Sequence, residues 1–460
     1  MMAFRACLEE ARLLIALAAP VLLAQISMVS MGFVDMVMTG RVGPEDMAAV
    51  ALAGSLWIPL VLFFQGILLA VTPITAQLRG AGEGEKSGHV IRQGLGMALV
   101  MAALLIAIIF GLSYCLEDLG VEARLADLTA RYLRAVIWGG VPFLLFVGLR
   151  CGAEGMGLMR PAMLAGFLGL LANIPCNYVL IFGEFGFPAL GGVGAGYATA
   201  LVYWVMFFVI LHQVRRHGEF RGFLARKNWT RPDPAMIRRI AGIGFPGALA
   251  VLLEVSLFAG VALLIAPFGS VVVAGHQVAL NFSSFIFMIP LSLGIAATVR
   301  TGHGIGLKSP EMVRRTARAA LALSLAAAFI TAVVTITLRG PIAVMYNKDP
   351  AVFALATHLL LYAAAYQWTD AFQVVSVGIL RGYNDTRAIF FITLVAYWLI
   401  ALPLGCVLGR TSLFGDARGP AGFWIAFIVG ISTAAVLLAG RLRVLERRFA
   451  ANPSAASLPR

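Results

Sequence analysis

Apolar runs follow one another along the whole chain and are separated by short polar or charged segments. Each run reaches the ~20 residues that an α-helix needs to cross the ~30 Å hydrocarbon core of a bilayer. Glycine, proline and charged residues mark the ends of the runs. The pattern predicts twelve spans, at residues 13–38, 48–77, 91–115, 132–152, 161–182, 191–214, 240–267, 271–299, 314–338, 353–380, 388–409 and 420–440. We therefore expect an all-α integral membrane protein with twelve transmembrane helices.

Short sequence matches relate the first six predicted spans to the last six. The matched segments are 14–20 with 240–246, 50–52 with 278–280, and 148–152 with 378–382. They occur in the same order in both halves and are offset by roughly 226 to 230 residues. Because six spans separate equivalent positions, both halves have the same orientation. The sequence therefore predicts two six-helix bundles, related by a parallel repeat about the membrane normal, with a cavity between them.

A basic segment divides the chain between the two sets of spans. Residues 215–239 contain eight Lys and Arg residues and two prolines, which is typical of a solvated linker at the membrane surface. We expect an N-terminal lobe at residues 1–214, this linker at 215–239, a C-terminal lobe at 240–442 and a tail at 443–460.

Composition and charge support a membrane protein and set its orientation. Of the 460 residues, 60% are hydrophobic and 12% are charged, whereas soluble domains have ~45–50% and ~25%. The predicted N-terminus, even-numbered loops and tail hold 27 of the 35 Lys and Arg residues. This asymmetry places both termini in the cytoplasm and brings the basic segments close to membrane lipids. Membrane topology thus accounts for the net charge of +13, and we expect no nucleic-acid partner.

Sequence motifs of enzymes and metal sites are missing. The five cysteines occur singly, without a CxxC pair or a histidine at ligand spacing, so they predict neither a disulfide framework nor a structural metal. No GxxxxGK[ST], HExxH or GxSxG segment is present. We expect a protein that is not an enzyme, needs no cofactor and does not use ATP.

Three acidic residues interrupt the predicted spans: Asp35 in span one, Glu254 in span seven and Asp370 in span ten. A carboxylate in hydrocarbon costs ~2.5–3.5 kcal/mol on insertion scales, so it faces the protein interior or a watery cavity. One interpretation is a structural acid paired with a basic side chain, but no Lys or Arg lies in the middle of a predicted span. The other is an acid that holds a proton, an ion or a charged ligand. Tyr366 precedes Asp370 by one helical turn, from where it is expected to form a hydrogen bond.

Polar side chains in other spans are candidates for the same cavity. Asn173 and Asn177 lie one turn apart in span five with Pro175 between them, which frees a backbone carbonyl for an ion or proton relay. The alternative is helix–helix hydrogen bonding, which membrane asparagines often perform. Gln25 on span one and Gln277 on span eight are weaker candidates, since each by itself is better explained by packing between helices.

Four segments together are characteristic of one transporter family. They are PVLLAQISMVSMGFVDMVMTGRVG at 20–43, LEVSLF at 253–258, AGHQVALNFSS at 274–284 and YQWTDAFQVVSVGILRGYNDTR at 366–387. With these segments the chain resembles the multidrug and toxic compound extrusion (MATE) family, and in particular its NorM branch. The resemblance extends over nearly the whole chain. It implies that the two bundles form a V-shaped central cleft and work by alternating access, driven by a gradient of H⁺ or Na⁺.

The resemblance also implies roles for the polar residues. Asp35, Glu254 and Asp370 match the membrane acids of such transporters, and Tyr366 lies beside the cation site of the C-terminal lobe. The N-terminal lobe of the family has a polar pair in span five, which Asn173 and Asn177 match. Some proton-coupled relatives carry an acid at the second position of that pair, where this chain has an asparagine. We therefore expect coupling, with transiently bound Na⁺ or H⁺, mainly at Glu254 and Asp370.

The function that these observations favour is efflux of small hydrophobic, cationic drugs in exchange for H⁺ or Na⁺. We expect a monomer in the plasma (inner) membrane. One alternative is a membrane-embedded enzyme that uses Glu254 and Asp370 as acid and base, which would need a nucleophile or metal nearby. Another is a flippase for lipid-linked oligosaccharides, as in proteins of a related fold. A flippase would need fixed Lys or Arg for the pyrophosphate, and the middle of the predicted spans has none.

Overall fold

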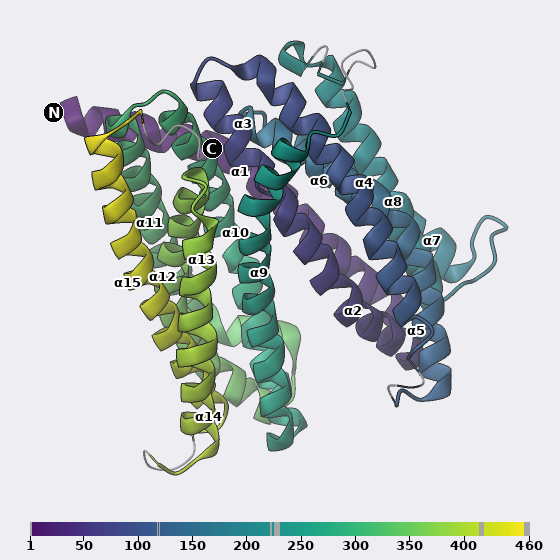
Figure 1. Ribbon diagram of the computed structural model, residues 1–460. Coiled ribbons are helices and arrows are strands. Elements are labelled where there is room, and N and C mark those ends of the chain that lie inside the picture. Colours follow the sequence, from purple (N-terminus) through teal and green to yellow (C-terminus); the bar gives the residue numbers. More distant parts are fainter. Residues whose placement is uncertain are drawn as a thin grey trace. The chain divides into compact units, whose positions relative to one another are not determined.

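The computed structural model describes residues 2–116, 118, 120–220, 223–224, 231–413 and 418–454. Over these ranges the chain is helical and contains no strand (Figure 1). The longer helices are α1 (Met2–Gly40), α2 (Pro44–Leu68), α3 (Val71–Gly80), α4 (Ser87–Leu112), α5 (Ala123–Val136), α6 (Gly140–Gly155), α7 (Arg160–Phe182), α8 (Gly192–Arg216), α9 (Pro234–Ile265), α10 (Ser270–Gly306), α11 (Pro310–Tyr346), α12 (Pro350–Gly382), α13 (Thr386–Thr393), α14 (Leu402–Arg410) and α15 (Pro420–Ala451).

Within the described ranges, twelve helical stretches are long and apolar enough to cross a membrane, which confirms the predicted number of spans. Three of the predicted spans are interrupted helices. Span two is α2 followed by α3, span four is α5 followed by α6, and span eleven contains a π-helical segment, η6 (Leu394–Ala401), between α13 and α14.

Proline explains each of these interruptions. A proline has no N–H to donate to the carbonyl four residues earlier, and its ring clashes with that carbonyl. Pro73 lies four residues after Leu69, where α2 gives way to α3. Pro142 likewise lies shortly after the end of α5, and Pro403 lies shortly after the end of the π-helical segment. Local π-helical geometry is one of the ways in which a helix accommodates such a lost bond.

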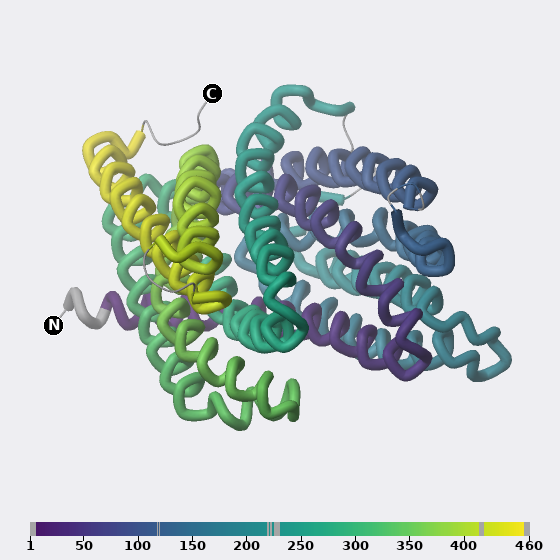
Figure 2. The backbone as a smooth tube through the Cα atoms, turned by 90° about the horizontal axis from the view of Figure 1, so that it is seen from below, coloured from purple at the N-terminus to yellow at the C-terminus, as the bar shows by residue number. Residues whose placement is uncertain are grey.

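The helices form two compact units. Unit 2, residues 23–248, contains α2 to α8 together with the second half of α1 and the start of α9. Its core is one hydrophobic cluster that includes Trp57, Phe64, Leu105 and Phe146. Helices α7 and α8 pack side by side as an antiparallel hairpin (Figure 2). Their loop turns at Gly183, whose φ of 77° lies in the left-handed region that glycine adopts readily.

Unit 1 comprises residues 1–22 and 249–460. Its closest helix pair is α10 with α12, whose backbones approach each other at Gly294 and Gly378. The single hydrogen of the Thr298 hydroxyl on α10 is shared between two carbonyl oxygens: Gly294 O of its own turn (2.9 Å) and Gly378 O across the pair (2.7 Å). Small residues at a membrane helix contact permit this close approach, which brings more backbone atoms into van der Waals contact.

The two units divide the chain differently from the predicted lobes, 1–214 and 240–442. Residues 1–22 of α1 belong to the C-terminal unit, and residues 234–248 of α9 belong to the N-terminal one. Glu10 explains the first difference: it is buried, and Arg300 donates to it at 2.8 and 2.7 Å. The Thr316 hydroxyl donates to the same carboxylate at 2.8 Å. Parts of the predicted linker (221–222, 225–230) and of the predicted tail (455–460) lie outside the described residues.

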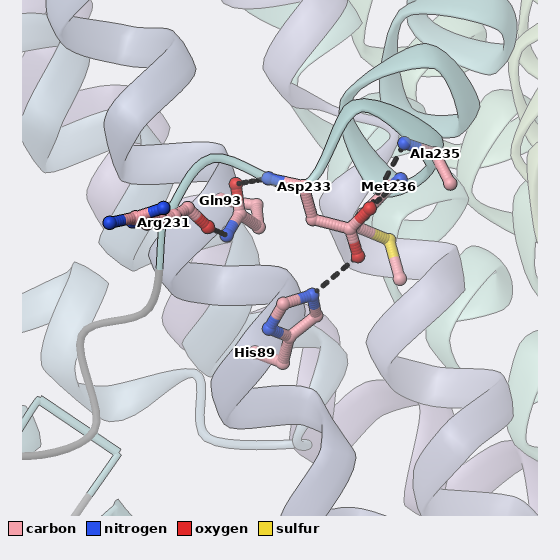
Figure 3. A network of polar contacts seen from close by, with 6 residues as sticks. All are labelled: His89, Gln93, Arg231, Asp233, Ala235 and Met236. Atoms are coloured by element: carbon pink, nitrogen blue, oxygen red, sulfur yellow. Dashed lines mark hydrogen bonds and ion pairs between the residues drawn. The ribbon is translucent and has the colours of Figure 1, made fainter.

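A polar network within unit 2 holds the start of α9 against α4 (Figure 3). His89 Nε2 donates to Asp233 Oδ2 at 2.9 Å. Gln93 donates to Arg231 O at 3.2 Å and accepts from the Asp233 N–H at 3.0 Å. Asp233 Oδ1 accepts from the backbone N–H groups of residues 235 and 236, so this carboxylate caps the helix.

Candidate functional site

Asp35 lies in a cluster of side chains from α1, α7 and α8 within unit 2. Its Oδ1 accepts hydrogen bonds from Asn173 Nδ2 at 2.9 Å and from Asn177 Nδ2 at 2.6 Å. Its Oδ2 accepts from the Thr199 hydroxyl at 3.2 Å. The structure thus brings together three of the predicted residues and adds Thr199. Three donors replace much of the hydration that the carboxylate loses in an apolar helix bundle.

The spacing of the two asparagines places them on one face of α7. Four residues make slightly more than one helical turn, so Asn173 and Asn177 point the same way, and both are almost fully buried. Each gives its amide NH₂ to Asp35, and neither Oδ1 has a hydrogen-bond partner within the described part of the chain. The cluster therefore combines one carboxylate with two amide oxygens that are available as ligands.

The second group of acids lies in unit 1, on α9 and α12. Asp370 is 3% exposed and forms a side-chain hydrogen bond with Tyr366, as their one-turn spacing predicts. Its Oδ1 has no partner among the residues that the structure describes. Glu254 on α9 is near enough to interact electrostatically with Asp370, Tyr366 and Tyr397. Two carboxylates and two phenolic hydroxyls therefore share one region of this bundle.

A small cavity between α10, α11 and α12 is lined in part by Asp370. Its lining is mostly apolar and includes Phe287 and Pro290. The polar side chains that line it are Ser283, Thr331, Tyr366, Gln367 and Asp370. Apolar walls around a carboxylate make its bare charge costly, which favours a bound proton or small cation at this position.

Two of the predicted residues lie apart from these clusters. Gln25 and Gln277 are half-buried, and neither side chain joins the hydrogen bonds around Asp35 or the group around Asp370. Gln367 and Thr199 are polar residues of these clusters that were not predicted from the sequence. Gln367 was recognisable from its position three residues before Asp370, on the same helix face. Thr199 carries no such signal, because threonine is common in helices that pack against others.

A buried ion pair in unit 2 was also not foreseen. Arg150 and Glu154, one turn apart on α6, are 4% and 3% exposed, and Arg150 Nε lies 3.6 Å from Glu154 Oε1. The guanidinium also lies 5.7 Å from the centre of the Phe146 ring. The i,i+4 spacing of opposite charges was readable from the sequence, but burial was not, because both residues lie near the predicted end of span four.

Comparison with known proteins gives a consistent result. The sequence profile of the MatE family matches residues 20–179 and again residues 246–407, one match in each half of the predicted repeat.

Three solved structures share the fold at low sequence identity. The eukaryotic MATE transporter AtDTX14 is 21% identical, with 98% of this chain and 100% of that chain covered and a TM-score of 0.86. The Vibrio cholerae MATE transporter VcmN in its bent form is 18% identical, with coverage of 97% and 99% and a TM-score of 0.85. A MOP superfamily transporter from Pyrococcus furiosus is 17% identical, with coverage of 96% and 97% and a TM-score of 0.87.

The family match extends over well more than half of the 460 residues and has the internal repeat that the sequence predicts. The fold of the solved MATE transporters extends over nearly the whole chain. This protein, whose described residues include twelve helices of spanning length, therefore belongs to the MatE family and is a membrane transporter, not an enzyme.

Proposed function

We propose that this transporter exports small hydrophobic, cationic compounds in exchange for H⁺ or Na⁺, by alternating access across the plasma (inner) membrane. Both termini lie in the cytoplasm in this proposal, in keeping with the distribution of Lys and Arg. The observation that carries the proposal is Asp370, a buried carboxylate with one oxygen lacking a partner among the described residues, at an apolar cavity.

A buried carboxylate couples two fluxes because it holds only one positive charge at a time. When a coupling ion occupies it, the negative charge is neutralised and a cationic compound loses its attraction to the site. When the compound occupies it, the ion is displaced. Competition for one charge thus makes binding of the ion and binding of the compound mutually exclusive, which is the condition for exchange. Glu254, Tyr366 and Asp370 form the coupling group in this proposal, and the Asp35 cluster serves the compound or a second ion.

The alternative of a flippase for lipid-linked oligosaccharides receives no support from the described residues. A pyrophosphate needs an accessible cation, and Arg150, a buried arginine in unit 2, is paired with Glu154. A buried pair of this kind has no charge left over for an anionic ligand.

The test is Asp370→Asn in proteoliposomes with an imposed H⁺ or Na⁺ gradient. The amide keeps the shape and one acceptor oxygen for Tyr366 but removes the charge. We expect uptake or efflux of a fluorescent cationic compound to respond to one of the two gradients in the wild type. In the variant we expect that gradient-driven flux to fall at least tenfold.

The matched control is Asp349→Asn, which changes an exposed N-cap aspartate at the start of the same helix. It should insert and transport like the wild type. If Asp370→Asn shows the same gradient-driven flux as the wild type at the same level of reconstituted protein, coupling at this carboxylate is refuted. A wild type that moves no cationic compound under any gradient would refute the proposed substrate class.

A further inference from the structure

Gln367 on α12 is held in one orientation by two threonines of α11. Its Nε2 donates to Thr335 Oγ1 at 3.0 Å. The Thr335 hydroxyl in turn donates to Thr331 O, one turn earlier on α11, at 2.7 Å. A hydroxyl has a single hydrogen, so Thr335 has already used its donor and faces Gln367 as an acceptor.

This chain of bonds decides which end of the Gln367 amide is free. If the amide were turned over, its oxygen would meet the Thr335 oxygen, and two acceptors would face each other. The NH₂ group therefore points to Thr335, and Oε1 is the atom left without a partner among the described residues. Because Gln367 is 5% exposed, this oxygen is also largely cut off from bulk solvent.

Two other residues that line the same cavity also have an oxygen without a partner within the described ranges, namely Asp370 Oδ1 and Ser283 Oγ. Gln367 and Asp370 are three residues apart, so they lie on the same face of α12, and both line the cavity. Leaving a buried acceptor unsatisfied destabilises the folded state, and the effect is larger for a charged group. Carboxylate, amide and hydroxyl oxygens are the ligands that hard cations bind, so a group of such oxygens without partners among the described residues is an arrangement that a small cation stabilises.

We propose that Gln367 supplies a second oxygen to the cation held at Asp370, and that Thr335 is the residue that positions it. The inference rests on the proposed coupling at Asp370 and extends it to a specific ligand set. For Na⁺, Gln367 Oε1 coordinates the ion together with Asp370 Oδ1. For H⁺, the protonated Asp370 donates its O–H to Gln367 Oε1. In both cases the ion or the acid proton satisfies an oxygen that has no other partner among the described residues.

The chain offers a close control for Gln367. Gln373 lies three residues after Asp370 on α12, as Gln367 lies three residues before it, so the two glutamines flank the acid on the helix surface. Gln373 is equally buried, at 4%, and its Oε1 also lacks a partner among the described residues. It does not line the cavity. Burial and chemistry are therefore matched, and access to the cavity is the difference.

The experiment measures thermal unfolding of the purified, detergent-solubilised protein as a function of cation. One arm raises NaCl at pH 8 with choline chloride keeping the ionic strength constant, and the other lowers the pH from 8 to 6 without Na⁺. A cation that binds only the folded state raises Tm, so the midpoint of the rise reports its apparent affinity. Only the part of the Tm rise that is lost in Asp370→Asn is assigned to the cation site.

In the arm to which the wild type responds, we expect Gln367→Met to weaken the apparent affinity at least tenfold. Thr335→Val, which keeps the shape but loses the acceptor, should have a similar effect. Thr335→Ser, which keeps the hydroxyl, should retain the wild-type cation affinity. The control Gln373→Met should also have the wild-type affinity. Met and Val keep the apolar volume, and a single symmetric peak in gel filtration checks that each variant is folded.

Wild-type affinity in Gln367→Met, or an equal loss in Gln373→Met, would overturn the assignment. So would a wild type with no Asp370-dependent response in either arm. Compound efflux by the same variants separates this inference from the proposed function. If cation binding depends on Gln367 but no compound is exported, the ligand assignment stands and the efflux proposal fails. If export keeps its wild-type cation dependence in Gln367→Met, the assignment fails and the efflux proposal stands.

Discussion

Individual buried charges in this protein are stabilised in two different ways. Arg150 is neutralised by Glu154 one turn away on the same helix. Asp370, in contrast, has a tyrosine hydroxyl as hydrogen-bond partner and one oxygen without any among the described residues. A paired charge is satisfied within the protein, whereas an acid with a vacant acceptor still has binding capacity. This difference separates the structural pair from the residues that we assign to transport.

Removing one member of the structural pair should destabilise unit 2. Glu154→Gln leaves the Arg150 guanidinium buried without a counter-charge, and loss of one partner of a buried pair typically costs about 3–5 kcal/mol. We expect a lower unfolding temperature for this variant and a partial recovery in Arg150→Met/Glu154→Leu, where neither charge remains. Thermal unfolding followed by gel filtration with fluorescence detection measures both. If Glu154→Gln is as stable as the wild type, Glu154 is not needed to neutralise the buried positive charge of Arg150.

At the scale of elements, the contact between α10 and α12 determines where Asp370 lies. The two helices meet at Gly294 and Gly378, and the Thr298 hydroxyl joins them with a hydrogen bond of 2.7 Å. The same pair of helices contributes most of the cavity lining. A shift of one helix against the other would therefore move Phe287 and Pro290 relative to the carboxylate.

Gly378→Ala should disturb this contact. The added Cβ would lie 2.8 Å from Gly294 Cα and clash with the Gly294 carbonyl oxygen, so backbone atoms would have to move. Overpacking of this kind costs about 1–3 kcal/mol and occasionally more. We expect a lower unfolding temperature and weaker cation binding, because Asp370 lies on the shifted helix. The control is Gly260→Ala on α9, where a Cβ meets no atom within 4 Å. Equal stability of the two variants would contradict the tight α10–α12 contact.

The cap at the start of α9 gives a prediction about pH. The hydrogen bond from His89, together with the backbone N–H of Met236, holds the pKa of the Asp233 carboxyl below its usual value. A group whose pKa is lower in the folded state stabilises that state above its unfolded pKa, and the stabilisation is lost as the pH falls through the folded pKa. The start of α9 should therefore be well protected at neutral pH and less protected in strong acid.

Hydrogen exchange at residues 235 and 236, corrected for the intrinsic pH dependence of exchange, measures this effect at pH 7 and pH 3. Asp233→Asn keeps an acceptor for the cap but loses the charge, so its protection should be lower at pH 7 and should not fall further in acid. Protection of the wild-type amides that is identical at the two pH values would show that the carboxylate contributes nothing to the cap.

For the whole molecule, contacts within one helix were predictable from the sequence, and contacts between helices were predictable only in part. Length and apolarity gave the twelve spans, and one-turn spacing predicted the hydrogen bond from Tyr366 to Asp370. The cost of burying charge drew attention to Asp35, although its partners on α7 and α8 depend on packing. The orientation of Gln367 is set by Thr335 on a neighbouring helix, and spacing along one chain does not encode it. Membership in the NorM branch, the coupling ion and the monomeric state stay predictions.

The division of α1 between the two units has a consequence for synthesis of the chain. Glu10 is buried against Arg300, which leaves the ribosome 290 residues later. At about 5–20 residues per second, that interval is about 15–60 s. Unit 2 is continuous in sequence, so its own segments are complete before Arg300 is made. The first half of α1 therefore waits at the membrane without its final neighbours, and a protein whose C-terminal half is delayed or truncated keeps an unpartnered acid near its N-terminus.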